Sequence, residues 1–222
     1  MNHIYYKEWI KTRWYLLLAL VITLCFSGYL ILRLDRAIEL KGIAHVWEVM
    51  LSRDAIFIDP IKYVPLLTGI LLAIVQFLPE MYHKCLKLTL HLPCSHLRLT
   101  NSMLGYGVAA LLVCFGLNLL ALYLYLQHGF APELVSRILM TSLPWFLAGI
   151  CAYLMVAWVV LEPTWKMRIV NLVISALALK IFYISGEPEA YNGFLVQLIV
   201  FTALTVTLSW NSIHRFKCGK QD

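Results

Sequence analysis

The sequence has few charged residues. They make up 14% of its 222 residues, whereas hydrophobic residues make up 61%. A soluble domain carries about 25% charged residues. Because so little polar surface cannot shield so much apolar surface from water, the composition excludes a water-soluble globular protein. We therefore expect membrane lipid to be the first partner of the chain.

Several motifs of enzymes and ligand-binding proteins are also missing. The sequence contains neither the G-x-x-x-x-G-K-[ST] loop that binds ATP phosphates nor the H-E-x-x-H pair of metalloproteases, and it has no nucleic-acid motif. One group of histidines and cysteines lacks any recurring zinc spacing, so we interpret it as surface polar residues. We expect no enzyme activity, cofactor or metal in this chain. The group is His83, Cys85, His91, Cys94 and His96.

The sequence does have six long apolar runs. A helix needs about 20 apolar residues to cross the hydrocarbon core of a bilayer. The runs predict an all-α integral membrane protein with six transmembrane helices and a single transmembrane domain over residues 1–222. The fifth run contains Lys180, which either reaches outward to the interface or faces a polar cavity. The predicted spans are residues 14–32, 63–78, 102–126, 138–161, 169–184 and 194–210.

The positions of lysine and arginine predict the orientation, because basic residues in short loops stay on the cytoplasmic side. One set of loops is clearly the more basic. It includes the N-terminus and the tail 211–222, so we predict that both termini are cytoplasmic. The net charge of +6 then favours anionic lipid and an acidic cytosolic partner over nucleic acid. The basic residues of this set are Lys7, Lys11, Arg13, Lys84, Lys87, Arg98, Lys166, Arg168, Arg215, Lys217 and Lys220.

Residues 3–13 have the pattern of an amphipathic helix that lies in the membrane interface. Its aromatic residues recur at helical spacing, and its charged residues occupy the opposite face. We expect the aromatic rings at the level of the lipid headgroups and the lysines against lipid phosphate. The aromatic face holds Tyr5, Tyr6, Trp9, Ile10 and Trp14, and the polar face holds Lys7, Glu8, Lys11 and Thr12.

Two further segments lie between predicted spans. Residues 33–62 form a long external loop, with a short helix predicted over residues 37–50. We predict that residues 79–95 form a basic amphipathic helix on the cytoplasmic side, in which Glu80 can pair with Lys84. Pro93 ends this helix, and Ser95 can cap the next one. Such a short helix, held between two spans, is suited to docking onto another protein.

Two motifs in these segments resemble the ABC type-2 permeases, the membrane subunits of many bacterial ATP-driven exporters. The stretch Lys7-Glu8-Trp9-Ile10-Lys11-Thr12-Arg13 looks like the elbow helix of that family. Glu80 and the stretch Leu92-Pro93-Cys94-Ser95-His96 are similar to the glutamate and the Leu-Pro-x-Ser-basic turn of its coupling helix. Histidine stands where the family usually has arginine, and the Gly-Thr that commonly follows the glutamate is missing.

The resemblance implies a permease subunit that forms a translocation pathway as a dimer, with a second copy or a homologous permease. It implies a bacterial inner membrane and separate cytosolic ABC ATPase subunits, which would hold ATP and Mg. It also assigns roles to two sets of residues. ATPase coupling would involve Glu80, Tyr82, His83, Lys84, Lys87, Pro93 and Ser95, and the elbow helix would involve Lys7, Glu8, Trp9, Lys11 and Arg13.

Other features leave alternatives open. Polar residues within the spans either line a substrate path or form hydrogen bonds between packed helices. Glu162 marks either a second ATPase contact or an ordinary turn. A six-helix importer subunit that binds a small molecule, or a membrane scaffold, is the alternative to an exporter. The candidate pathway residues are Asn118, Asn171, Lys180 and Gln197, and the small residues Gly105, Gly107, Ala109 and Ala110 suit close helix packing or a dimer interface.

Overall fold

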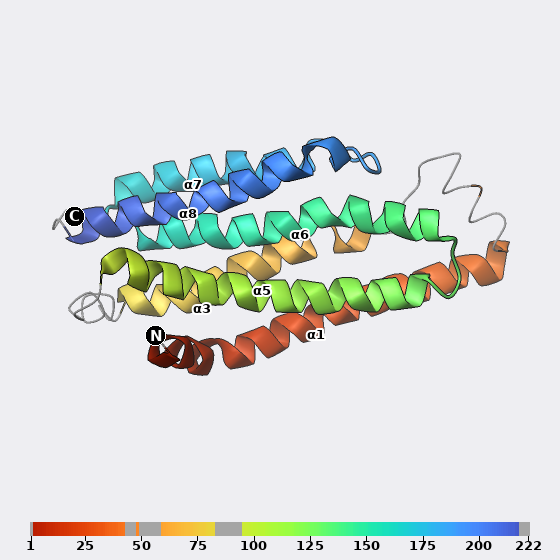
Figure 1. The fold of residues 1–222 in the computed structure, drawn as a ribbon, viewed down its shortest axis with the longest axis horizontal. Coiled ribbons are helices and arrows are strands. Elements are labelled where there is room, and N and C mark those ends of the chain that lie inside the picture. The colour runs from red at the N-terminus through yellow and green to blue at the C-terminus, as the bar shows by residue number, and fades with distance from the viewer. Residues whose placement is uncertain (1, 43–47, 49–58, 83–94, 218–222) are drawn as a thin grey trace.

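The structure is a computed structural model that describes residues 2–42, 48, 59–82 and 95–217. Within these ranges it is helical and contains no strand, which confirms the all-α part of the predicted fold class. The helices lie side by side in an elongated bundle (Figure 1). The α-helices are α1 (Asn2–Lys41), α3 (Val64–Tyr82), α5 (His96–Leu126), α6 (Pro132–Leu161), α7 (Trp165–Lys180) and α8 (Leu195–Lys217), and the single-turn 3-10 helices are η1 (Asp59–Ile61), η2 (Ile181–Tyr183) and η3 (Asn192–Phe194).

Five helical segments of the described chain are long and apolar enough to cross a membrane. They correspond to α1, α3, α5, α6 and the segment that contains α8. The predicted fifth span, residues 169–184, falls on α7 and η2. Because α7 has only 16 residues, a sixth crossing stays a prediction. The fold is that of a multi-pass helical membrane protein.

Most helices extend beyond the apolar runs that predicted them. α1 continues to Lys41 and so enters the predicted external loop, and α8 continues to Lys217, inside the predicted tail 211–222. α5 and α6 begin at His96 and Pro132, before the predicted starts of their spans. Backbone hydrogen bonds continue a helix whatever the polarity of its side chains. Hydropathy therefore marks the apolar part of a helix and misses its polar end turns.

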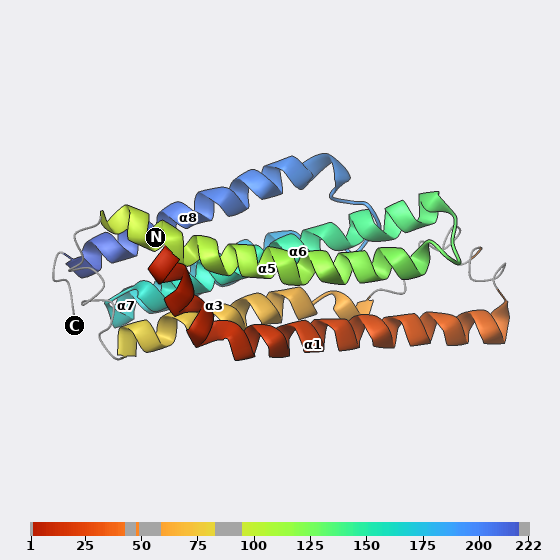
Figure 2. The ribbon, with the colours of Figure 1, turned by 60° about the horizontal axis from the view of Figure 1, so that its bottom comes forward.

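The predicted elbow helix and the first span form one continuous helix, α1. Figure 2 shows that the N-terminal turns of α1 run at a steep angle to the rest of the helix. The predicted boundary at residues 13–14 therefore lies inside one continuous helix, whose N-terminal turns are bent away from the rest. The external helix expected over residues 37–50 begins inside α1, and its remainder lies almost entirely outside the described residues.

α3 and α6 form the centre of the bundle, where two glycines let the helices approach closely. A Cβ atom on Gly149 would lie 2.5 Å from the backbone oxygen of Pro65, and one on Gly69 would overlap the backbone oxygen of Gly149. Gly107 of α5 likewise gives space to the Tyr153 ring. Gly107 therefore serves packing inside the chain, whereas a Cβ atom on Gly105 would meet open space.

Both termini of the described chain lie at one end of the bundle (Figure 1). We call it the basic end. It holds the start of α1, the end of α3, the start of α5, the α6–α7 connection and the end of α8. This grouping is the one expected if successive connections alternate between the two ends of the bundle. The cytoplasmic placement of the basic end remains a prediction from its charge.

Candidate functional site

All three carboxylates that the structure describes at the basic end are buried. The exposed fractions of Glu8, Glu80 and Glu162 are 0%, 2% and 1%. A buried carboxylate is costly unless cations or hydrogen-bond donors compensate it. Each of the three lies close to lysine or arginine side chains, and they form two clusters on different pairs of helices. We take these clusters as the candidate functional site.

The first cluster, which we call the Glu80 cluster, consists of Lys7, Glu8, Lys11 and Glu80. The ammonium groups of Lys7 and Lys11 lie 2.8 Å and 2.9 Å from the same oxygen, Oε1 of Glu80. Lys11 Nζ is also 2.9 Å from Glu8 Oε2, an ion pair without hydrogen-bond geometry. The cluster is neutral overall, and it joins the N-terminal turns of α1 to the last turn of α3.

The hydrogen bonding of the Glu80 cluster is incomplete. Within the described part of the chain, Glu80 Oε2 and both carboxylate oxygens of Glu8 are buried without a hydrogen-bond partner. A buried acceptor without a donor costs about 1–3 kcal/mol, and more when it is charged. The four side chains therefore hold the two helices together mainly by charge. Three carboxylate oxygens remain that could accept hydrogen bonds if the side chains moved.

The polar face of the N-terminal segment turns toward the protein, which differs from the expectation that its lysines meet lipid phosphate. Lys7 and Lys11 contact Glu80 instead. The aromatic face points outward, with Trp9 and Trp14 exposed by 52% and 68%. The physical reason is the buried carboxylate on α3, which attracts the lysines. Helical periodicity correctly separated the two faces but could not show which one the bundle covers.

A layer of neutral hydrogen bonds also joins helices in the buried interior. Thr12 Oγ1 donates to the backbone oxygen of Glu8 at 2.9 Å and lies 2.7 Å from the hydroxyl of Tyr106 on α5. Since a threonine hydroxyl has one hydrogen, Tyr106 donates the second bond. On α3, the amide nitrogen of Gln76 donates to the backbone oxygen of Met103, and its oxygen accepts the hydroxyl of Tyr153 at 2.7 Å. These bonds link α1, α3, α5 and α6.

The second cluster, which we call the Glu162 cluster, joins the end of α6 to α8. Ser212 Oγ donates to Glu162 Oε2 at 2.6 Å, and Arg215 Nη1 lies 3.2 Å from Glu162 Oε1. The Oε1 atom also accepts the hydroxyl of Thr164, and Arg168 donates to the backbone oxygen of Glu162 at 2.6 Å. Both carboxylate oxygens are therefore bonded. The turn after α6 is a specific inter-helix connection.

The predicted ATPase-coupling residues are divided among three situations. α3 continues through Pro79 to Tyr82, so Glu80 belongs to a membrane helix and is buried there. Tyr82 is 83% exposed. Ser95 precedes α5 at the N-cap position, but its side chain makes no capping bond. The other coupling residues, with the predicted Glu80–Lys84 pair, lie outside the described residues: His83, Lys84, Lys87 and Pro93.

The candidate pathway residues do not converge. Asn118 is buried and accepts a hydrogen bond from Ser27 of α1 at 2.9 Å, so it links two packed helices. Asn171 is buried in the middle of α7, and Lys180 is exposed at the last residue of that helix. Gln197 is exposed on α8. The packing alternative accounts for Asn118 directly, and a shared pathway stays a prediction.

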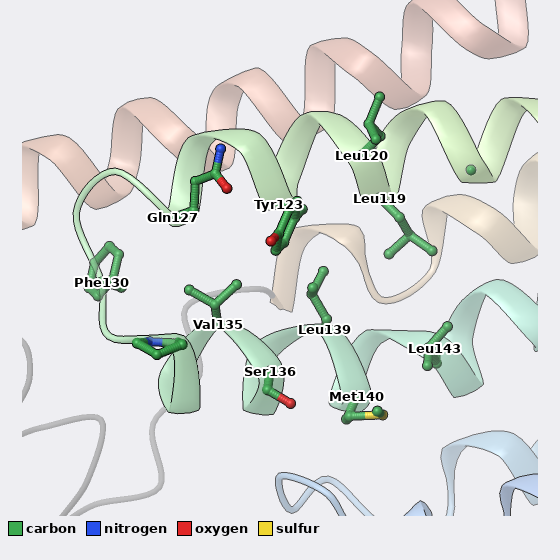
Figure 3. A pocket seen from close by; sticks show the side chains of 12 residues that line it. Leu119, Leu120, Tyr123, Gln127, Phe130, Val135, Ser136, Leu139, Met140 and Leu143 are labelled. Carbon is green, nitrogen blue, oxygen red and sulfur yellow. The ribbon is translucent and has the colours of Figure 1, made fainter.

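The end of the bundle opposite the basic end has an open pocket of about 690 Å³ between α5 and α6. Its lining is mostly aliphatic, and Figure 3 shows the ring of Tyr123 directed toward Val135 and Leu139. Gln127 and Ser136 supply its other polar side chains. No charged residue lines this pocket, so its chemistry suits an apolar or neutral group.

Sequence reasoning missed the long-range partners at the basic end. The pairing of Glu80 with Lys7 and Lys11, and of Glu162 with Arg215, depends on how distant helices dock. A usable signal was present, because Gln76 and Glu80 lie within or beside an apolar run. Polar residues in such places usually face the bundle interior and have a partner there.

Comparisons with models of protein families, with curated proteins and with solved structures find no match to this chain. The described residues include no group of three or more His, Cys, Asp or Glu side chains that could hold a metal ion. The function must therefore be argued from the two clusters, the topology and the charge distribution.

Proposed function

We propose that this chain is the transmembrane permease subunit of an ATP-driven exporter that resembles the ABC type-2 class. It would lie in the bacterial inner membrane with both termini in the cytoplasm, and form the pathway with a second copy or a homologous permease. Separate cytosolic ABC ATPase subunits would bind ATP and Mg and drive the transport.

The single observation that carries this proposal is the Glu80 cluster. It ties the N-terminal turns of α1 to the last turn of α3, and that last turn, up to Tyr82, is the start of the segment 79–95 proposed to dock on the ATPase. A movement of that segment would displace α3, and the ion pairs would carry the displacement to α1. Rigid-body switching of this kind needs stiff elements joined at the point where the force enters.

The basic end as a whole supports the same role. Its described carboxylates are buried in the two clusters, whereas basic side chains such as Arg98 and Lys166 are exposed there. An exposed surface of one charge attracts a partner of the opposite charge. The ATPase surface that docks here would therefore be acidic.

The test is purification of the full chain from its native membrane with any bound P-loop ATPase, followed by reconstitution of the pair in liposomes. We expect ATP hydrolysis to rise when the permease is present. Glu80→Gln should weaken that rise by about fivefold or more, the usual range for coupling between two sites. Glu133→Gln, which removes an exposed carboxylate at the opposite end, is the matched control.

Two results would contradict the proposal. One is an intact, membrane-inserted chain that carries no P-loop ATPase. The other is an ATPase whose turnover is the same with and without the chain. The amount of each variant in the membrane must be measured, because a loss of coupling is informative only when insertion is unchanged.

A further inference from the structure

A groove of about 700 Å³ runs between α1 and α5 at the basic end. Its floor is formed by side chains that are almost fully buried, including Leu16, Tyr106 and Cys114. The Tyr106 hydroxyl is engaged by Thr12. From Arg13 to Leu20 the groove follows α1 for about 10 Å, at 1.5 Å per helical residue. The groove is therefore an apolar depression between two helices, with side chains of α1 and α5 as its walls.

The mouth of this groove has a different chemistry from its floor. Trp9, Arg13 and Trp14 line it, and the Arg13 guanidinium lies 5.6 Å from the centre of the Trp14 ring. Tryptophan rings favour the boundary between hydrocarbon and headgroups. The Arg13 end of the groove therefore has the chemistry of the boundary where a phospholipid carries its phosphate, and the apolar stretch toward Leu20 suits an acyl chain.

Among the residues that the structure describes, no carboxylate compensates the positive charge of the mouth. Lys7 and Lys11 are engaged by the Glu80 cluster, but within the described residues Arg13 contacts no carboxylate. Glu8, Glu80 and Glu162 are buried, so a second copy of the chain would bring no exposed described carboxylate of the basic end to Arg13. No described anionic group of the protein complements this mouth, and an anion from outside the protein would do so.

We propose that this groove binds one anionic phospholipid, with its phosphate at Arg13 and an acyl chain along the floor between α1 and α5. Arginine is well suited to phosphate, because its planar guanidinium donates two parallel hydrogen bonds. The site does not depend on the exporter function proposed above. It adds a specific lipid ligand at the place where the N-terminal turns of α1 meet the bundle.

The experiment is native mass spectrometry of the full, detergent-purified chain titrated with dioleoylphosphatidylglycerol or dioleoylphosphatidylcholine. We expect the anionic lipid to bind about fivefold more tightly, which corresponds to the ~1 kcal/mol that one basic residue contributes near an anionic lipid. Arg13→Gln should remove this preference. Lys166→Gln removes an exposed basic residue at the same end but outside the groove, and should leave the preference unchanged.

A second variant tests the groove itself. Ala109 lines the groove and is exposed, so Ala109→Phe should fill it without disturbing the core and should weaken binding of both lipids. Equal affinity for the two lipids in the unchanged chain would overturn the proposal. So would retention of the preference in Arg13→Gln, or unaltered lipid binding in Ala109→Phe. A chain that dimerises through this face and binds neither lipid would assign the groove to a second copy instead.

Discussion

The Glu80 cluster and the Glu162 cluster compensate buried carboxylates in different ways. Each buries a carboxylate at the basic end and uses it to join two helices. Glu162 has both carboxylate oxygens bonded, by Ser212, Thr164 and Arg215. In the Glu80 cluster, two ammonium groups share one oxygen and three other carboxylate oxygens accept no hydrogen bond within the described chain.

This difference separates a fixed connection from an adjustable one. A fully bonded carboxylate loses several directed bonds when its helices move, so it holds a single geometry. Charge attraction without complete hydrogen bonding depends less on direction, and lysine ammonium groups can turn to other oxygens. We therefore expect α6 and α8 to keep one geometry at the Glu162 cluster. At the Glu80 cluster, α1 should stay attached to α3 and move with it, while the lysines exchange carboxylate oxygens during the movement.

The largest effect is expected for Glu162→Ala. It leaves the buried Ser212 hydroxyl and the mostly buried Arg215 side chain without their acceptor, and removal of one partner of a buried ion pair costs about 3–5 kcal/mol. Thermal unfolding of the detergent-purified chain measures this loss. Glu162→Gln keeps an acceptor for Ser212 and should lose less. Equal stability of the alanine variant and the unchanged chain would show that the Glu162 cluster does not hold α6 and α8 together.

An intermediate effect is expected for Glu80→Ala, at about 1–3 kcal/mol, because only one of its two carboxylate oxygens is bonded. After the change, Lys11 can still pair with Glu8, and Lys7, whose side chain is 41% exposed, can turn to water. The same thermal unfolding assay ranks this variant against Glu162→Ala. If Glu80→Ala proved the more damaging, the comparison between the clusters would be reversed.

The smallest effect is expected for Glu8→Gln, within about 1 kcal/mol in either direction. The substitution removes a buried charge whose oxygens accept no described hydrogen bond, so the desolvation cost that disappears offsets the lost attraction to Lys11. Lys11 keeps Glu80 as its partner. Unfolding measured beside Glu133→Gln, the exposed control, checks this. A loss as large as that of Glu162→Ala would show that Glu8 has partners beyond the described residues.

The apolar runs predicted the existence of the helices well, and for a physical reason. Hydrocarbon leaves the backbone no partner except itself, so a long apolar run must be helical. The same runs placed the helix ends less accurately. α1 continues to Lys41 and α5 begins at His96, because polar turns outside the hydrocarbon remain helical without any hydropathy signal.

The candidate site was only partly predictable. Spacing correctly put Lys7, Glu8 and Lys11 on one face of a helix. It could not show that this face turns toward Glu80, because that contact joins residues 69 positions apart and exists only after α1 and α3 have docked. Local pairing rules offered Lys84 as the partner of Glu80, since they consider only neighbours three or four residues away.

The Glu80 cluster also has a consequence for the order of events during synthesis. Lys7 and Lys11 emerge from the ribosome well before Glu80, which lies 69 residues beyond Lys11. In that interval they are unpaired with Glu80, and they can act as the positive flank that sets the orientation of the first span. Once α3 is inserted, the same ammonium groups become interior partners of its carboxylate. The charges that are predicted to orient the newborn chain are thus part of the internal structure of the folded chain.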